Sequence, residues 1–319
     1  MLTRSPRVPP SLFVFLIICF FAGYYHFTPL STDIDPFLAS SGQTSSPSKN
    51  GPRIGIVTFV TEERSYLHAS LMGKAHYARR HGYDLIVDYE AHADRGIMWW
   101  KFEMITRLIR ENKYDWLWWI DFDTLITNTD IKVADIIEET LANATAPDEI
   151  DYLLTHDCNG LNMGSFIARA HERSVKFFKD TSAIETHGRE KGESMSEQDA
   201  MVRLLETDPA TAHRAIQVPQ WKLNAFPDEI SCFDEHEIGW KPGTFVLHFA
   251  GAWAHVKGED PTGQLMRKYE TEVVWGDWKE LYPGPGVTDE YRIVSCNWSR
   301  LGPEEFGFRL SEGLSDGQD

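Results

Sequence analysis

A short tryptophan-rich stretch that runs directly into two carboxylates constrains this chain more than any other feature. It reads Trp-Leu-Trp-Trp-Ile-Asp-Phe-Asp over residues 116–123. A short apolar run of this kind predicts a buried strand, central in a parallel sheet. Side chains two positions apart on a strand project from one face, so Asp121 and Asp123 are expected to converge where the strand ends.

The carboxylate pair suggests a bound cation. Ligands of open α/β sheets bind at the carboxyl ends of the strands, which is where Asp121 and Asp123 fall. Burying two close ionised carboxylates is costly without a compensating cation, and a hard divalent ion that also contacts a substrate phosphate would meet this need. The alternative is that Asp121 caps the following turn and Asp123 is merely solvated. The tryptophan-rich strand in front of the pair favours the functional interpretation.

The segments before this strand alternate between strand and helix patterns. Strands are expected at 53–59 and 84–88, and helices at 67–77 and 98–109, the latter from an apolar stripe that begins at Met98. This order is typical of right-handed βαβ units on a parallel sheet. The Gly-x-Gly-x-x-Gly fingerprint of dinucleotide-binding proteins is absent from the sequence.

Further elements are expected after the carboxylate pair. The sequence predicts a helix at 131–141 with Thr129 or Asn128 as its cap, and a strand at 152–155. A last core strand is expected at 245–251. An additional helix should open after Ser196, which is a good N-cap residue, and run to about Glu206.

Several polar residues in these elements have two interpretations when each is taken alone. Gly160 and Gly164 indicate either a tight turn where backbone approaches a ligand or an ordinary hairpin. Glu197 suits the positive end of a helix, and Lys101 suits a solvated surface. A histidine in an apolar strand, such as His248, is more often a satisfied core residue than a ligand.

The formal net charge of −17 argues against a nucleic-acid partner, which would require basic patches. It also repels any ligand that carries phosphate. A bound metal and a few well-placed lysine or arginine side chains would have to reverse the field locally.

The N-terminus predicts a membrane anchor. An apolar run from Leu12 to Tyr25 follows Arg4 and Arg7, which favours a single-pass signal anchor with the rest of the chain lumenal. The alternative is a cleaved signal peptide, and a mature N-terminus between Tyr24 and Ser41 would establish it. A segment rich in Ser, Pro, Gly and Thr then predicts a flexible stem. The expected organisation is a cytoplasmic tail at 1–10, a transmembrane anchor at 11–27, a stem at 28–52, a catalytic domain at 53–310 and a disordered tail at 311–319.

Two sequons fit a lumenal location, at Asn143 and Asn297. Outside the apolar run the chain has three cysteines, Cys158, Cys232 and Cys296. They permit at most one intrachain disulfide, and the sequence leaves open which two of them pair. Their spacing does not match a zinc site.

Four motifs together resemble one family, the fungal galactosyltransferase and mannan mannosyltransferase group, which is related to plant xyloglucan xylosyltransferases (glycosyltransferase family 34). They occur in the family's order and the resemblance covers about residues 53–269. The motifs are Trp-Ile-Asp-Phe-Asp at 119–123, Gly-Leu-Asn-Met-Gly-Ser-Phe at 160–166, Glu-Gln-Asp-Ala at 197–200 and His-Phe-Ala-Gly at 248–251.

The resemblance implies a fold, a cofactor and a metal site. The fold is glycosyltransferase A, a Rossmann-like α/β domain with a mostly parallel central sheet, and the cofactor is Mn²⁺ used with a nucleotide-sugar. Asp121, Asp123 and His248 would bind the metal, which replaces the core interpretation of the histidine.

The resemblance also implies roles in donor binding and catalysis. Gln198 would lie beneath the anomeric carbon of the donor sugar, with Glu197 beside it as a second catalytic candidate. The residues implied to bind the donor are Lys101, Asp121, Asn162, Gly164 and Lys257.

The implied function is a retaining, Mn²⁺-dependent hexosyltransferase of the Golgi membrane that acts on glycoproteins or cell-wall mannan. The sequence does not choose between UDP-galactose and GDP-mannose as donor, although galactose is favoured, and it does not name the glycan acceptor. Alternatives are an α-1,6-mannosyltransferase of a mannan polymerase complex, a silent scaffold that holds other glycosyltransferase subunits, and a metal-dependent phosphohydrolase. The complete ligand set argues against the scaffold, and the lack of two-metal carboxylate clusters argues against the hydrolase.

Overall fold

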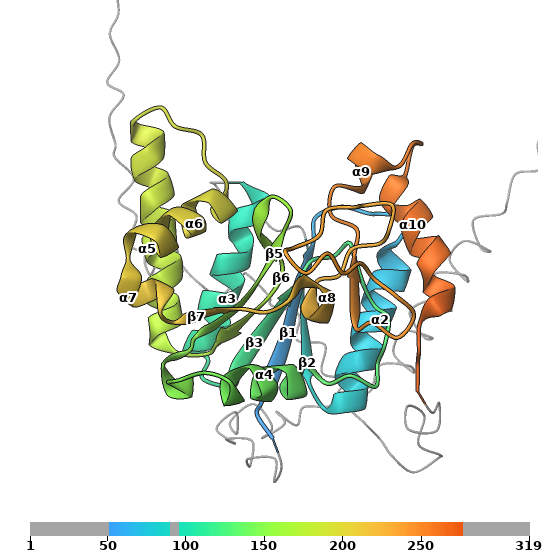
Figure 1. Ribbon diagram of the computed structural model, residues 1–319, viewed down its shortest axis with the longest axis horizontal. Helices are drawn as coiled ribbons and strands as arrows, with labels where there is room; N and C mark the ends of the chain where they lie inside the picture. Colours follow the sequence, from blue (N-terminus) through green and yellow to red (C-terminus); the bar gives the residue numbers. More distant parts are fainter. Residues whose placement is uncertain (1–50, 90–95, 277–319) are drawn as a thin grey trace, which may run out of the picture. The chain divides into compact units, whose positions relative to one another are not determined.

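The computed structural model describes residues 51–89 and 96–276 (Figure 1). The predicted cytoplasmic tail, membrane anchor and C-terminal tail lie outside these residues, as do most of the predicted stem and the end of the predicted catalytic domain. The sequon at Asn297 and the residue Cys296 also lie outside them. None of the helices in the described ranges is long and apolar enough to cross a membrane, and the anchor at 11–27 stays a prediction.

The main sheet of the described chain has six strands in the order β2-β1-β3-β6-β5-β7. Neighbouring strands run parallel, except that β6 is antiparallel to both β3 and β5. This confirms the predicted mostly parallel sheet, with the tryptophan-rich strand β3 inside it. The strands are β1 (Ile54–Val60), β2 (Asp84–Tyr89), β3 (Trp116–Ile120), β5 (Tyr152–Asp157), β6 (Gly160–Arg169) and β7 (Ala215–Gln217).

A separate two-stranded antiparallel sheet carries the histidine motif. It pairs β4 (Thr124–Ile126) with β8 (Val246–His248). The prediction of a last core strand over 245–251 was therefore wrong in length and in the sheet that it joins. Phe249 still bonds to Asp123 through its N–H, but the chain turns directly after it: the Ala252 N–H donates to the Phe249 carbonyl, and Gly251 adopts a left-handed conformation with φ of 64°.

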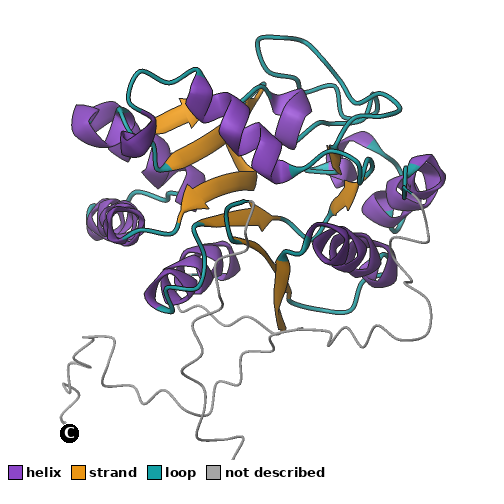
Figure 2. Cartoon of the chain, turned by 90° about the horizontal axis from the view of Figure 1, so that it is seen from below, coloured by secondary structure: helices purple, strands orange, loops and turns teal. Residues whose placement is uncertain are grey.

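Strand β3 explains why the sheet is covered on both faces. Trp118 and Trp116 pack with helices α2 (Leu67–His81) and α4 (Val133–Ala142) on one face. Trp119 packs on the other face with α3 (Trp100–Arg110), α5 (Glu172–Glu190) and α6 (Glu197–Thr207). Figure 2 shows helices on both sides of the strands. Because an alternating strand presents large indole rings to both layers, it must lie inside the sheet.

The remaining helices are short. They are α7 (Pro209–Ala212), α8 (Gln220–Leu223), α9 (Ala252–His255) and α10 (Pro261–Tyr269), with 3₁₀ turns η2 (Ile97–Trp99), η3 (Pro147–Glu149) and η4 (Glu270–Glu272).

The helix predictions were right in type and less accurate at the ends. Helix α2 extends to His81, where Gly82 closes it in a left-handed conformation. Helix α4 begins at Val133 with Lys132 in the N-cap position, so neither Thr129 nor Asn128 caps it, and the Thr129 hydroxyl donates to the Val274 carbonyl. Met98 lies in η2 and is 40% exposed, so it does not belong to the buried stripe of α3.

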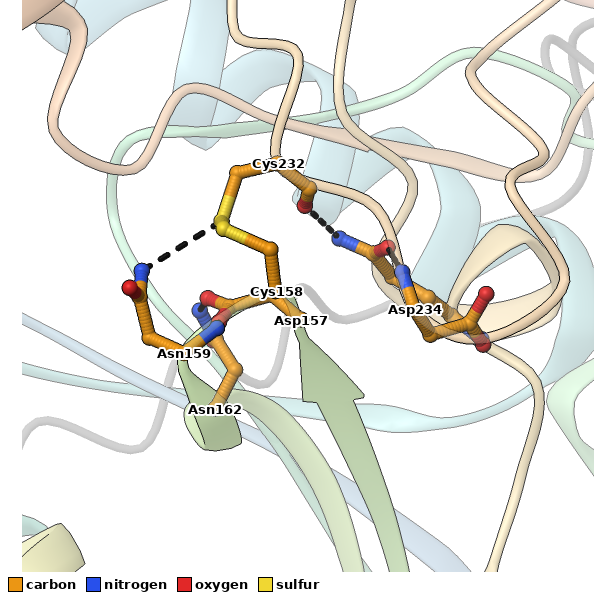
Figure 3. The surroundings of a disulfide bond; sticks show 7 residues. Asp157, Cys158, Asn159, Asn162, Cys232 and Asp234 are labelled. Carbon is orange, nitrogen blue, oxygen red and sulfur yellow. Dashed lines mark hydrogen bonds between the residues drawn. A yellow bond between two sulfur atoms is a disulfide. The ribbon is translucent and has the colours of Figure 1, made fainter.

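The disulfide whose partners the sequence left open joins Cys158 to Cys232 (Figure 3). Cys158 lies in the turn between β5 and β6, and Cys232 lies in the loop that follows α8. The bond therefore ties two segments 74 residues apart. Because both sulfur atoms are bonded to each other, they do not form a metal site with the neighbouring Asp157.

Candidate metal centre

The two aspartates lie in a turn between β3 and β4 and not on the strand itself. β3 ends at Ile120, so the expected projection of Asp121 and Asp123 from one strand face is corrected. The Asp121 N–H donates to the Gly164 carbonyl at 2.7 Å, and the Thr124 hydroxyl donates to the Asp121 carbonyl at 2.7 Å. The turn, fixed at both ends, brings the carboxylates together.

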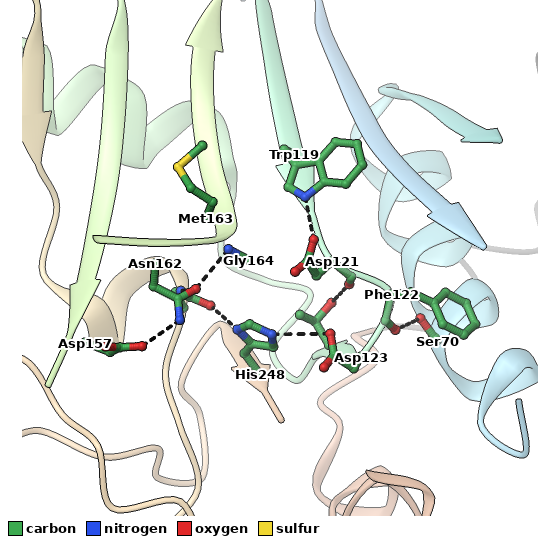
Figure 4. A network of polar contacts seen from close by, with 12 residues as sticks. Ser70, Trp119, Asp121, Phe122, Asp123, Asp157, Asn162, Met163, Gly164 and His248 are labelled. Atoms are coloured by element: carbon green, nitrogen blue, oxygen red, sulfur yellow. Dashed lines mark hydrogen bonds and ion pairs between the residues drawn. The ribbon is translucent and has the colours of Figure 1, made fainter. Parts of the chain in front are cut away.

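This turn faces His248 (Figure 4). Thr124 of β4 pairs with His248 of β8, which brings the imidazole back to the turn. Potential ligand atoms of Asp121, Asp123 and His248 all lie within 4.8 Å of one another, and His248 Nε2 is 3.3 Å from Asp123 Oδ1. The structure thus assembles the three residues that the sequence predicted as metal ligands.

The donor set fits a divalent cation. Two carboxylates and one imidazole suit Mn²⁺, whose ligands are oxygen and imidazole nitrogen atoms. The orientation of the histidine also fits, because its Nδ1 bonds to protein and its Nε2 faces the carboxylates.

The three groups perturb one another strongly. Burial raises the pKa of Asp121; the Lys101 ammonium opposes this and the Asp123 carboxylate adds to it, so the net shift is upward. Burial also disfavours charge on Asp123, but the His248 imidazole outweighs it and lowers the pKa of Asp123. Burial opposes charge on His248, yet Asp123 raises its pKa. Charge on the imidazole is thus favoured by the same carboxylates that would favour a bound metal ion.

Lys101 is completely buried, contrary to the surface interpretation. Its Nζ donates to Glu197 Oε1 at 3.2 Å and to the Met163 carbonyl at 3.3 Å, and it lies 3.9 Å from Asp121 Oδ1. Glu197, predicted as a catalytic candidate, is buried in this ion pair. The Lys101 ammonium group of this pair is the positive charge next to the Asp121 carboxylate.

Gln198 bonds to the same residue of β6, Met163, as Lys101 does. Its Oε1 accepts a hydrogen bond from the Met163 N–H at 2.8 Å. The predicted N-cap is confirmed, because Ser196 and Asp199 form a reciprocal capping box at the start of α6. The cap fixes the first turn of the helix, and with it the backbone of Gln198.

Asn162 and Gly164 lie beside the histidine. Asn162 Nδ2 donates to Asp157 Oδ2 at 2.7 Å, and its Oδ1 accepts from the Gly164 N–H at 2.9 Å. A Cβ atom at Gly164 would lie 2.1 Å from His248 Cε1. The glycine thus makes room for the imidazole, while its implied contact with a donor sugar stays a prediction.

Two residues of α2 that support the aspartate turn were not predicted. The Ser70 hydroxyl donates to the Phe122 carbonyl at 2.5 Å, and Lys74 Nζ donates to the Thr124 carbonyl at 3.1 Å. Burial lowers the pKa of Lys74 to about 7, although Asp123 opposes the shift. Ser70 and Lys74 are spaced i, i+4 on the helix, and this spacing does not indicate in the sequence that they are buried.

Lys257, the second lysine predicted to bind the donor, lies on an exposed stretch between α9 and α10. The contacts that join the other predicted residues do not include it. A further residue that sequence reasoning missed, Asn224, is fully buried and bonds to His248.

The fold and the Asp-Asp-His cluster define an α/β protein of the glycosyltransferase A type. A crystal structure of a glycosyltransferase involved in the glycosylation of the major capsid of PBCV-1 has the same fold, with a TM-score of 0.52 and 14% identity over 68% of this chain and 100% of that chain. Residues 52–146 and 138–258 match the galactosyl transferase GMA12/MNN10 family, and the chain belongs to that family. This confirms the family that the four motifs indicated.

Two curated relatives are more similar in sequence than that crystal structure. An uncharacterized alpha-1,2-galactosyltransferase of Schizosaccharomyces pombe is 25% identical, over 67% of this chain and 63% of that protein. The probable alpha-1,6-mannosyltransferase MNN10 of Saccharomyces cerevisiae is 28% identical, over 62% of this chain and 58% of that protein. The chain thus spans about three fifths of the length of these relatives.

Proposed function

We propose that the protein is a Mn²⁺-dependent, retaining hexosyltransferase that moves galactose from UDP-galactose to a glycan acceptor. The observation that carries this proposal is the convergence of Asp121, Asp123 and His248 within 4.8 Å at the carboxyl end of β3. Family membership and the galactosyltransferase relatives support it. Transfer of mannose from GDP-mannose is the second candidate, which the relative named as a mannosyltransferase supports.

We assign each residue of the site a role in this reaction. Asp121, Asp123 and His248 would hold the metal ion, which when bound supplies a Lewis acid for the departing nucleoside diphosphate. Lys101 reduces the repulsion around Asp121, and the Ser70 and Lys74 contacts keep the turn in one conformation. The contribution of the protein is positioning and electrostatic stabilisation.

The state of the nearby carboxylates favours front-face attack over double displacement. Double displacement requires a free carboxylate beneath the anomeric carbon. Glu197 is paired with Lys101, and Asp199 is bonded to Ser196 in the helix cap. Gln198, an amide, is the expected neighbour of that carbon, so the departing phosphate oxygen would take the acceptor's proton.

The donor is tested by thermal denaturation of the full-length protein in detergent with UDP, GDP, UDP-galactose or GDP-mannose, each with and without Mn²⁺. We expect UDP compounds to raise the melting temperature only with Mn²⁺, because the metal ion would hold the diphosphate. A ligand at 100 times its Kd adds about 2.7 kcal/mol to the free energy of unfolding, which is enough to be measured. Stabilisation by GDP compounds alone would establish the mannosyl alternative. A response to neither nucleotide would contradict an enzymatic role and favour a scaffold.

Variants of Gln198 test the mechanism. Gln198→Ala should lose about 100-fold in rate through mispositioning but give the same product anomer. Gln198→Glu should impair transfer and trap no sugar, because its charge adds to a site that already holds two carboxylates and a diphosphate. The exposed Gln264→Ala is the control and should transfer at the wild-type rate.

Product NMR gives the anomer, and intact-protein mass spectrometry after incubation with donor alone reveals any adduct. A hexose bound to Glu197 or Asp199 of the wild-type protein would mean double displacement.

A further inference from the structure

A hydrogen-bonded series of polar side chains, buried except for the half-buried Asp157 at its start, joins the β5–β6 hairpin to His248 (Figure 4). It runs from Asp157 through Asn162 and Asn224 to the imidazole. We infer that Asn224 is a positioning residue that fixes which nitrogen of His248 keeps its hydrogen, so that Nε2 is the nitrogen presented to a metal ion. The inference deepens the proposed function and rests on the metal role of His248.

The donor and the acceptor of each hydrogen bond in this series follow from groups that can only donate or only accept. The Gly164 backbone N–H can only donate, so the atom of Asn162 that it meets at 2.9 Å must be the oxygen. The other end of the Asn162 amide, its Nδ2, then faces Asp157 Oδ2 at 2.7 Å, and a carboxylate accepts this hydrogen bond. The orientation of Asn162 is thereby set by two independent partners.

The orientation of Asn162 determines that of Asn224. Asn162 Oδ1 lies 2.9 Å from the Asn224 side chain, so the group that meets it must be the donor, Nδ2. The same Nδ2 donates to Thr155 Oγ1 at 3.0 Å, which uses both of its hydrogens. Asn224 Oδ1 is left to face His248 Nδ1 at 2.8 Å, and because it can only accept, Nδ1 must carry a hydrogen.

The consequence for His248 is a single usable ligand atom. Nδ1 keeps its hydrogen whether the ring is neutral or charged, so a proton displaced by a metal ion comes from Nε2. That atom lies 3.3 Å from Asp123 Oδ1, within the metal centre. A metal-binding histidine whose second nitrogen donates to a protein oxygen is held in one tautomer and one ring orientation.

Burial and backbone contacts make this arrangement rigid. Asn224 and Thr155 are fully buried, and His248 is 2% exposed, so water does not compete for these bonds. The backbone on either side of the amide is also tied down. The Asn224 N–H donates to the Gln220 carbonyl at 2.7 Å, and the His248 N–H donates to the Ala225 carbonyl at 2.8 Å.

Three variants test the inference by Mn²⁺ affinity, measured from the electron paramagnetic resonance signal of free Mn²⁺. Asn224→Leu removes the acceptor and should weaken Mn²⁺ binding 10- to 100-fold, the usual effect of losing such a partner. Asn224→Asp keeps an acceptor for Nδ1 and should bind Mn²⁺ at least as well as wild type. Its second oxygen opposes Asn162 Oδ1, so its melting temperature should fall.

Gln220→Leu is the matched control. Gln220 is also a fully buried amide, bonded to the Cys232 carbonyl and the Asp234 N–H but not to His248. It should lose stability without losing Mn²⁺ affinity. If Asn224→Leu binds Mn²⁺ as tightly as wild type, or if Gln220→Leu weakens binding equally, the inference is overturned.

The tautomer can be read without metal, which separates this inference from the proposed function. ¹⁵N-histidine spectra of the metal-free wild-type protein, with His248 assigned by its loss in His248→Gln, should show a hydrogen on Nδ1. A bare Nδ1 would overturn the inference even if Mn²⁺ binds. Failure of the wild-type protein to bind Mn²⁺ would overturn the proposed function, and a protonated Nδ1 would still support the role of Asn224.

Discussion

Asp123→Ala and His248→Ala are each expected to reduce Mn²⁺-dependent transfer by more than about 100-fold, since loss of a direct ligand should exceed the effect of losing a supporting residue. Each change removes one of three ligand atoms that lie within 4.8 Å of one another. Asp123→Ala removes the ion pair with His248 but also a charge that raises the pKa of Asp121, so the two effects on stability oppose each other and the fold should be kept. Transfer of labelled sugar, Mn²⁺ affinity and melting temperature measure the three effects.

Matched controls come from α5, outside the metal centre. Asp180→Ala and His187→Ala remove the same side-chain types from surface ion pairs with Lys176 and Glu190. Such pairs contribute about 0–1 kcal/mol, so both variants should retain transfer and Mn²⁺ binding. Full activity of Asp123→Ala or His248→Ala with unchanged Mn²⁺ affinity would show that the metal binds elsewhere.

The elements of the centre that the sequence predicted are those with a local pattern. The run Trp116–Ile120 has strand length and an aromatic-rich composition, and it is fully buried as β3. Ser196 has the residue type of an N-cap, and it is one. Asp121, Asp123 and His248 were placed by the motifs that they share with a family, and the structure brings them together.

The residues that were missed or misread depend on partners far away in the chain. Lys101 resembles a surface lysine because lysine is rarely buried without a partner, and its partner Glu197 is 96 residues away. Asn224 has no motif around it, and its role appears only when α8 lies beside β8. The short β8 was overestimated because periodicity does not reveal the turn made after His248.

Gly164→Ala is expected to weaken Mn²⁺ binding strongly through a single added carbon. The Cβ would lie 2.1 Å from His248 Cε1 and 2.7 Å from its Nδ1, far inside van der Waals contact. Gly164 is not one of the glycines with positive φ, so the backbone itself accepts alanine. The imidazole, held by Asn224 and Asp123, must therefore move or β6 must shift, at a cost of about 1–3 kcal/mol.

Gly73→Ala is the control for the loss of a glycine. Gly73 is buried in α2, and a Cβ there would meet no atom within 4 Å. Alanine in a helix interior is favoured over glycine by about 1 kcal/mol, so this variant should be at least as stable as wild type. Its Mn²⁺ affinity and transfer rate should be unchanged.

A double-mutant cycle identifies the clash as the cause. In the His248→Ala background the two histidine atoms that Gly164→Ala would strike are gone and only Asn162 Oδ1, at 3.0 Å, stays close, so adding the second change should cost much less stability than it does in the wild-type protein. Equilibrium denaturation of the four proteins measures this difference. If Gly164→Ala costs the same in both backgrounds, the glycine serves the backbone of β6 and not the histidine. If Gly164→Ala alone binds Mn²⁺ normally, the imidazole does not occupy the position from which it would bind the metal.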